Sequence, residues 1–240
     1  RLDPLELENI QKDIAYSMIR RKSFNDARVL KKWQVIIDAT ELDEGYQKKN
    51  DYYLSRCYNR GKADKFMKYH RSVLEAKLYL GNDFVCSIAS EPIENTEEYI
   101  NQSDEKIKQD CESKAFVRLA KKIKKSFPRL PIIITADGLY VSQKVIQTCT
   151  DNGWDYIIRY KEGCAPSIAQ EYQELPEKEK IGSEIEYQNQ IMFQNTDVNL
   201  IYYTEKKIQA DGEEKITKFA WITNITITKS NAKKIVKAGR

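Results

Sequence analysis

The sequence is poor in the residues on which many classes of enzyme depend. It contains a single histidine, His70, among 240 residues, which excludes mechanisms that need several imidazoles and disfavours a Ser-His-Asp site. Its five cysteines are scattered, and no two of them form a C-x-x-C pair. This odd set argues against a disulfide framework and a zinc site, and it favours reduced thiols in a cytoplasmic protein.

Long apolar runs and a strong excess of charge are also missing. No apolar stretch is long enough to cross a bilayer, and no charged-then-apolar leader opens the chain, so we expect no membrane association. The 40 Lys and Arg residues exceed the 36 Asp and Glu residues only slightly, and the net charge of +4 is a weak indication of a nucleic-acid partner. Lysines do cluster at 121–125 and 233–240, but solvated helix faces are the simpler explanation of both clusters.

Two short apolar runs that each end in an aspartate are the most informative feature present. Residues 35–37 precede Asp38, and residues 131–136 precede Asp137. Short runs rich in β-branched residues are typical of buried strands, and ligands of open α/β sheets bind outside the carboxyl ends of such strands. If the two strands are parallel neighbours, their carboxylates converge and can hold a divalent cation such as Mg²⁺.

The order of the expected elements predicts how these strands are arranged. In chain order, the expected elements are a helical lead-in at 1–32, strands at 33–38, 72–80 and 84–88, a helix at about 110–127, a strand at 131–136, a helix at 142–151 and a strand at 155–161. Gly81-Asn82-Asp83 is a hairpin signal between the second and third strands. A right-handed crossover then places the fourth strand beside the first. The result is an α/β fold with a mixed, ribonuclease H-like sheet in the order 3-2-1-4-5.

The chain changes character after Gly163. Residues 183–227 alternate in the manner of strands, with Asp211-Gly212 as the expected turn of a hairpin. We interpret residues 163–228 as a β-rich insertion in a core that spans 33–240. Ser230 is the expected N-cap of a helix that the end of the chain at Arg240 interrupts.

Each aspartate also has an ordinary structural explanation. Asp38 is explained equally well as a strand-to-loop acid, and Asp137, which precedes Gly138, as a turn residue. Taken singly, these explanations are favoured. Their expected adjacency is what makes a metal site competitive, because two metal ions held by carboxylates activate a nucleophile in phosphodiester cleavage.

Six segments of the chain resemble stretches of bacterial insertion-sequence transposases of the DDE type, related to the IS4 group. The segments, in family order, are WxVIIDAT at 33–40, KQDCE at 108–112, FPRLP at 127–131, ADGLY at 136–140, NGWDYI at 152–157 and FAWITN at 219–224. The resemblance implies a ribonuclease H-like catalytic core interrupted by a β-rich insertion. It also implies metal-dependent DNA strand cleavage and strand transfer in transposition, a form of DNA recombination.

The resemblance further implies a set of site residues and partners. Three acids of the family bind two Mg²⁺ ions, which Mn²⁺ can replace, and Asp38 and Asp137 match the first and second acids. The family's glutamate lies on a helix a few residues past the position of Arg240, so no residue here matches it. We therefore expect this fragment to be inactive by itself. The implied partners are transposon-end DNA, target DNA and a second protomer that forms a homodimer on DNA.

Other residues are secondary candidates. Glu91, Asp110 and Glu112 are expected near the same sheet edge, although helix capping explains Asp110 and Glu112 more simply. Arg159 and Lys161 end the strand beside the Asp137 strand and are candidates for contacts with DNA phosphates.

Two other functions stay open. A decayed or repurposed transposase core that binds DNA or protein without catalysis is favoured by the missing glutamate. Another ribonuclease H-like nuclease, such as a resolvase, shares the metal site but does not explain the β-rich insertion.

Overall fold

The structure is a computed structural model that describes residues 3–95, 109–175, 177–208 and 212–240. Residues 96–108, which precede the expected helix at about 110–127, and Asp211 of the expected Asp211-Gly212 turn lie outside these residues. Within the described ranges, no helix combines the length and the apolar character that crossing a membrane requires.

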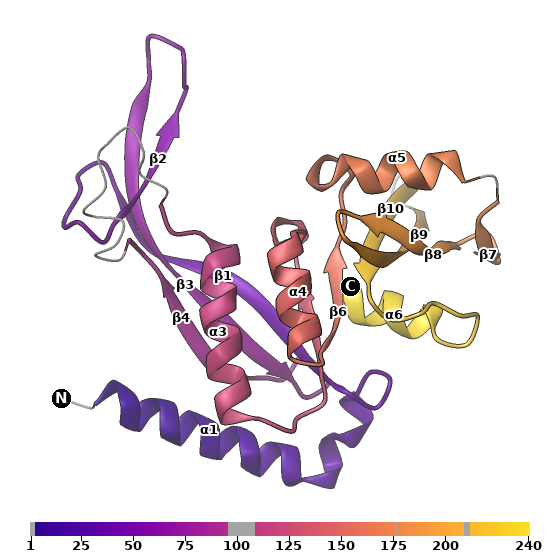
Figure 1. Ribbon diagram of the computed structural model, residues 1–240, viewed down its shortest axis with the longest axis horizontal. Helices are drawn as coiled ribbons and strands as arrows, with labels where there is room; N and C mark the ends of the chain where they lie inside the picture. Colours follow the sequence, from indigo (N-terminus) through magenta and orange to yellow (C-terminus); the bar gives the residue numbers. More distant parts are fainter. Residues whose placement is uncertain (1–2, 96–108, 176, 209–211) are drawn as a thin grey trace.

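The fold is a mixed α/β fold built on one sheet of ten described strands, most of them antiparallel (Figure 1). The strands are β1 Trp33–Gly45, β2 Leu54–Tyr58, β3 Phe66–Tyr79, β4 Val85–Ile93, β5 Ile132–Ala136, β6 Asp155–Arg159, β7 Glu179–Ile181, β8 Ile185–Phe193, β9 Thr196–Ile208 and β10 Glu214–Thr223. The helices are α1 Pro4–Arg20, α3 Glu112–Ser126, α4 Gln143–Asp151, α5 Pro166–Glu174 and α6 Ala232–Gly239. This architecture is compatible with a ribonuclease H-like fold.

The sheet has a parallel centre between antiparallel flanks. β5 pairs in parallel with both β1 and β6, and β1 pairs antiparallel with β3. The other edge of β3 pairs with β2 along its first part and with β4 along its second part. Beyond β6 the order continues through β10, β9 and β8 to β7, all antiparallel.

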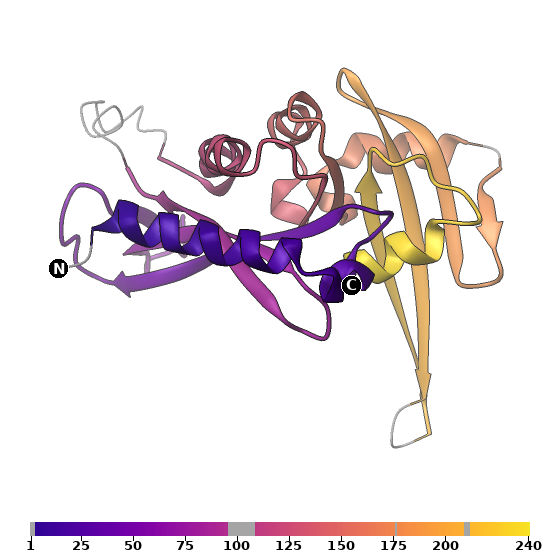
Figure 2. The ribbon, with the colours of Figure 1, turned by 90° about the horizontal axis from the view of Figure 1, so that it is seen from below.

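Helices cover both faces of the parallel centre. α3 and α4 pack on one face over a core that includes Val35, Ile134 and Phe116. Figure 2 shows these two helices together on one side of the sheet. α6 packs on the other face, where Ile235 and Val236 join a second cluster of buried residues. Because both faces are covered, the central strands consist of nearly continuous apolar runs.

Several sequence predictions are confirmed. The hairpin between β3 and β4 forms at Gly81-Asn82-Asp83, and all three residues have positive φ. α4 begins after Ser142, whose hydroxyl accepts a hydrogen bond from the backbone N–H of Val145.

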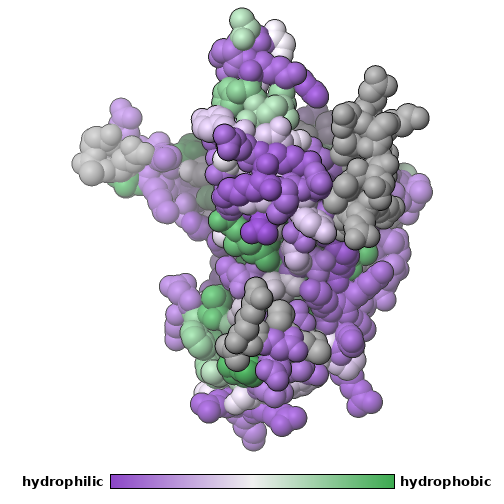
Figure 3. Space-filling view, turned by 90° about the vertical axis from the view of Figure 1, so that its left-hand side faces the viewer, coloured by the Kyte–Doolittle hydropathy of each residue, from purple (hydrophilic) through white to green (hydrophobic). Residues whose placement is uncertain are grey.

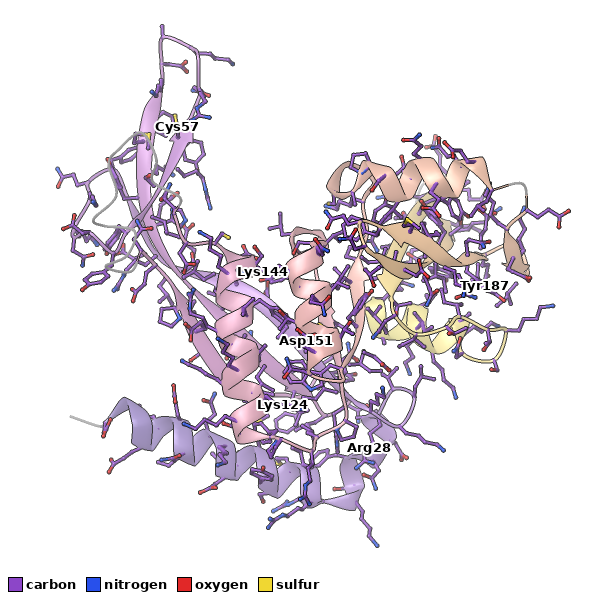
Figure 4. The ribbon with its side chains drawn as sticks, viewed as in Figure 1. Arg28, Cys57, Lys124, Lys144, Asp151 and Tyr187 are labelled. Carbon is purple, nitrogen blue, oxygen red and sulfur yellow. The ribbon has the colours of Figure 1, made fainter. Side chains whose placement is uncertain are left out.

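A side-chain hydrogen bond joins the two helices α3 and α4. Near the end of α3, Lys124 donates to the carbonyl of Asn152, just after the labelled Asp151 of α4 (Figure 4).

Other predictions are wrong in their boundaries. The first strand does not end at Asp38 but continues to Gly45, because a long antiparallel pairing with β3 extends it. The helical lead-in expected at 1–32 is only partly α-helical, since α1 ends at Arg20 and a 3-10 helix at Lys22–Ala27 follows it. The N-cap of α6 is Asn231, whose side chain accepts from the N–H of Thr228, and not Ser230.

The strands β7–β10 continue the same sheet, because the end of β10 pairs antiparallel with β6. β9 and β10 form a long ribbon that projects away from the helices (Figure 2). The opposite side of the molecule, at the left of Figure 1, is largely hydrophilic wherever Figure 3 colours it. Its small apolar patches are of the kind that soluble surfaces ordinarily carry.

Candidate acidic site on strand β1 and after strand β5

Asp38 and Asp137 occupy matching positions on neighbouring parallel strands. The last pair in the register of β1 with β5 joins Ile36 to Thr135, and each aspartate lies two residues further along its chain. Neighbouring strands are about 4.8 Å apart, so the two positions lie side by side where β5 ends. Both side chains are exposed, and neither makes a salt bridge with a described residue.

A short turn sets the position of Asp137. The residue caps the 3-10 turn Gly138–Tyr140, and its Oδ1 accepts a hydrogen bond of 2.9 Å from the backbone N–H of Leu139. Gly138 makes a close approach, because an added Cβ would lie 3.1 Å from Sγ of Cys164. The turn explanation of Asp137 is therefore correct, but it uses only one of the two carboxylate oxygens.

The alternation of side chains along β1 places Asp38 on the face that α6 covers. Val35 and Ile37 point into the core beneath α3, so Gln34 and Asp38 face the other way. The amide of Gln34 donates to the carbonyl of Ala238 at 2.9 Å and to Oγ1 of Thr135 at 3.2 Å. These buried bonds hold the end of α6 against the strands that carry the aspartates.

Trp221 also fixes the end of α6. Its indole Nε1 donates to the carbonyl of Gly239 at 2.8 Å. A Cβ on Gly239 would lie only 2.4 Å from that nitrogen, so glycine permits the close approach.

Tyr140 is buried in the core three residues after Asp137, and sequence reasoning missed it. Its side chain is 1% exposed, and its hydroxyl makes no hydrogen bond of standard geometry with any described residue. Burial raises the pKa of Tyr140, and the carboxylates of Glu112, Asp137 and Asp38, in that order, raise it further. The only signal in the sequence was an aromatic residue three positions after Asp137.

Glu112 is the first residue of α3 and sits on the same side of that helix as Phe116, one turn later. The ring of Phe116 meets the ring of Tyr140 edge-on, with a centroid distance of 6.3 Å. Glu112 therefore faces the turn that follows Asp137. Its carboxylate also lies favourably near the positive end of the helix dipole.

Glu91 and Asp110, the other secondary acids, are bound to cations of the protein. Arg118 donates to Asp110 at 2.6 Å and to Glu91 at 2.5 Å. Lys122 forms a salt bridge of 2.8 Å with Glu91. The side chain of Asp110 is fully buried, and its hydrogen bond with Arg118 is the main cause of the raised pKa of that arginine. We call these four residues the Arg118 cluster. It joins α3 to β4.

Arg159 and Lys161 differ in their surroundings. Arg159 ends β6, and its guanidinium lies over the rings of Phe219 and Trp221, at 4.5 and 5.1 Å. Burial lowers the pKa of Arg159, but guanidinium groups remain charged at neutral pH. Lys161 is exposed and lies after β6 rather than on it.

The carboxylate oxygens of Asp38 and Asp137 are suitable ligands for a hard divalent cation. Mg²⁺ is commonly held by one or two carboxylates together with water and substrate phosphates, and it does not require a complete protein cage. Asp38 and Asp137 supply two carboxylates that no protein cation neutralises within the described residues. No group of three or more His, Cys, Asp or Glu residues in the described part of the chain is arranged to hold a metal ion.

Comparison with known proteins gives one family. A comparison with curated proteins finds no match. The family model described as "Transposase DDE domain" matches residues 108–240, which is more than half of the chain and includes Asp137, Arg159 and α6. The chain therefore belongs to the DDE transposase family, of the IS4-like type.

Proposed function

We propose that this protein is the catalytic core of a transposase that cleaves transposon ends and transfers the cut strand to target DNA. Membership of the family implies a DNA substrate and the chemistry of transposition, which in this family generally requires a divalent metal. The observation that carries the proposal is the register match of Asp38 and Asp137, two exposed acids without cationic partners among the described residues.

The proposed domain organisation follows from the order of the elements. Residues 1–32 form a helical lead-in, and residues 33–240 form the core. Strands β4, β3, β1, β5 and β6 are its ribonuclease H-like part, and residues 163–228 are the β-rich insertion. The antiparallel pairing of β10 with β6 supports an insertion that leaves the sheet after β6 and returns beside it.

In the proposed site, Asp38 and Asp137 hold Mg²⁺, with Mn²⁺ as a substitute. The bound ion would activate water and stabilise the leaving oxygen of the phosphodiester. The N–H of Leu139 fixes one oxygen of Asp137, which leaves the other free to bind. Arg159 and Lys161 would contact DNA phosphates, with Arg159 oriented by the aromatic rings beneath it.

The third acid of the family has no match in this sequence. We propose that the helix direction begun by α6 provides it, because Gln34 and Trp221 hold the end of α6 on the face that carries Asp38. A core that lacks this acid would bind DNA without cutting it, which is the alternative function.

The test is an Mg²⁺-dependent nicking assay on a duplex that carries the DNA flanking the gene. The protein is assayed as residues 1–240 and with any residues that its gene encodes after Arg240. We expect nicking in the extended form and its loss in Asp38→Asn and Asp137→Asn. Asp151→Asn, at the far end of α4 (Figure 4), is the matched control. Full activity in either active-site variant would refute the assignment, and binding without nicking in both forms would favour the alternative.

A further inference from the structure

One arm of the sheet carries the positive charge of the protein. We call residues 46–71, which comprise the loop after β1, strand β2, the turn that follows it and the first part of β3, the basic arm. Figure 1 shows the arm projecting beyond the helices at the upper left, and Cys57 marks it in Figure 4. The arm contains eight Lys and Arg residues but only two Asp residues, a net charge of +6, whereas the whole chain carries +4. The rest of the chain is therefore slightly acidic.

Three cations at the tip of the arm lack an acidic partner among the described residues. Arg60, Lys62 and Lys65 are exposed, and they take part in none of the salt bridges of the described chain. Asp64, the acid of the tip, accepts a hydrogen bond of 2.6 Å from the side-chain amide of Asn59. Like charges this close in sequence repel one another, and an anionic partner relieves that repulsion.

Three aromatic rings lie against one another on the same arm. The rings of Tyr58 and Phe66, a cross-strand pair of β2 and β3, are stacked at a centroid distance of 5.0 Å with 7° between their planes. The ring of Tyr46 lies 5.9 Å from that of Phe66. Tyr46 is 71% exposed and Phe66 is 36% exposed. Solvent therefore reaches these rings, which belong to neither of the buried clusters.

A lysine lies beside the rings. Nζ of Lys68 is 5.6 Å from the ring centroid of Tyr46 and 5.5 Å from that of Tyr58. Nζ also forms a salt bridge of 2.6 Å with Glu44. Because Glu44 neutralises it, Lys68 serves to hold the rings in place, and the cations of the tip are the ones available to a ligand.

The stability of the hairpin explains only part of this arrangement. A cross-strand aromatic pair stabilises two antiparallel strands, and this accounts for Tyr58 and Phe66. It does not account for the exposed ring of Tyr46, which lies outside the strands, or for the cations at the tip. Exposed rings combined with cations are typical of surfaces that bind single-stranded nucleic acid, where bases stack on the rings and phosphates contact the cations.

We propose that the basic arm binds single-stranded DNA, an inference that rests on the DNA substrate of the proposed function but not on its cation site. Unpaired bases stack on the rings of Tyr46 and Phe66, and phosphates lie along Arg60, Lys62 and Lys65. A strand freed at a nick offers the unpaired bases that duplex DNA conceals.

The arm is far enough from the two aspartates to be tested separately. Asp38 pairs with Glu75 of β3, and Phe66 lies about 30 Å from Glu75 along the same strand. Substitutions on the arm therefore leave the cation site untouched. Binding of DNA by the arm needs no metal ion, so it can be measured in the presence of EDTA.

The experiment measures, by fluorescence anisotropy, binding of a labelled oligo-dT of about 16 nucleotides and of a duplex of equal length. At about 0.2 M salt, where non-specific duplex binding is weak, we expect the protein to prefer the single strand. Phe66→Leu should weaken single-strand binding by a factor of about 10, because leucine keeps apolar contacts but offers no ring face. Phe84→Leu is the matched control, since Phe84 is 47% exposed and its ring stacks on Phe24 at 6.3 Å, beyond the opposite end of β3.

The cations of the tip give a second measurement. The combined variant Arg60→Gln, Lys62→Gln and Lys65→Gln should reduce the slope of log affinity against log salt by about 2, because each phosphate contact on a single strand contributes about 0.7. Its melting temperature should not fall, since the substitutions remove repulsion, and thermal melting of each variant shows that it folds.

The outcomes separate the arm from the proposed catalysis. Equal effects of Phe66→Leu and Phe84→Leu, tighter binding of the duplex or an unchanged salt slope would overturn single-strand binding by the arm. If Asp38→Asn abolishes nicking while Phe66→Leu binds the single strand normally, only the role of the arm is refuted. Weaker binding in Phe66→Leu, together with no nicking by any form of the protein, would support the arm and refute the catalysis.

Discussion

Two groups of acids in this protein have similar sequence surroundings but differ in burial and in their cationic partners. Asp38 lies within β1 and Asp137 directly follows β5; both are exposed and have no cationic partner within the described residues. Glu91 and Asp110 are buried, and Arg118 binds both of them. Both groups lie close to the ends of apolar elements, where acids are expected to mark functional sites.

The difference teaches that the partner of an acid, rather than its position, decides its role. A buried carboxylate is stable only when it is paired and hydrogen-bonded, and then it has little capacity left for a ligand. An exposed carboxylate without a partner stays solvated and can exchange water for a cation. The Arg118 cluster therefore stabilises the fold, whereas Asp38 and Asp137 are available to bind a cation.

The largest expected effect concerns catalysis. Asp137→Asn should reduce DNA nicking by a factor of about 10³ or more, or ~4 kcal/mol in the activation barrier, because a ligand of the cation is lost. The melting temperature should stay close to that of the wild type, since the amide can still accept from the N–H of Leu139. Nicking rates and thermal melting provide the two measurements. A large loss of stability in Asp137→Asn would show that Asp137, like the acids of the Arg118 cluster, stabilises the fold.

The converse substitution tests the other side of the comparison. Arg118→Met should lower the free energy of unfolding by about 3 kcal/mol, because Asp110 and Glu91 are left buried with too few partners. Urea denaturation measures this change. Lys77→Met removes only a half-buried ion pair with Glu75 and should cost less than about 1 kcal/mol. Equal costs for the two variants would show that the cluster is not a structural centre.

A smaller effect is expected from the cation alone. Mg²⁺ at about ten times its Kd should raise the free energy of unfolding by about 1.4 kcal/mol, because it binds only the folded protein. Chelation should reverse the gain, and Asp38→Asn should abolish it. Asp110→Asn should lower the free energy of unfolding, but Mg²⁺ should still raise it by the same amount as in the wild type. The prediction is wrong if Mg²⁺ stabilises Asp38→Asn as much as it stabilises the wild type.

The smallest effect comes from His70, which lies in neither acidic group. Burial, followed by the charge of Arg56, lowers the pKa of His70 below its ordinary value of 6.5. The unfolded chain therefore takes up the proton first, and the contribution of His70 to stability is present above pH 6.5. That contribution is lost as the pH falls through the lower pKa of the folded state. A His70→Gln variant should show a shallower decline of stability in acid than the wild type, which urea denaturation at several pH values would reveal.

Local sequence signals predicted the elements whose cause is local. The run at 131–136 is a buried strand, and Gly81-Asn82-Asp83 turns because three successive residues adopt positive φ. Prediction failed for strands whose bounds depend on pairing with segments that are distant in the sequence. β1 continues past Asp38 because β3 pairs with it, and β2, which local patterns did not predict, forms on the edge of β3.

By itself, the sequence determined the apolar runs, the acid that follows each of them and the resemblance to DDE transposases. Only the tertiary structure decided which acids are neutralised. Arg118 reaches Glu91 across 27 residues of sequence, and the carboxylates of Glu112, Asp137 and Asp38, from three different elements, raise the pKa of Tyr140. Composition and spacing carry no information about such pairings, because the strength of an interaction between charges depends on distance in space and on burial from water.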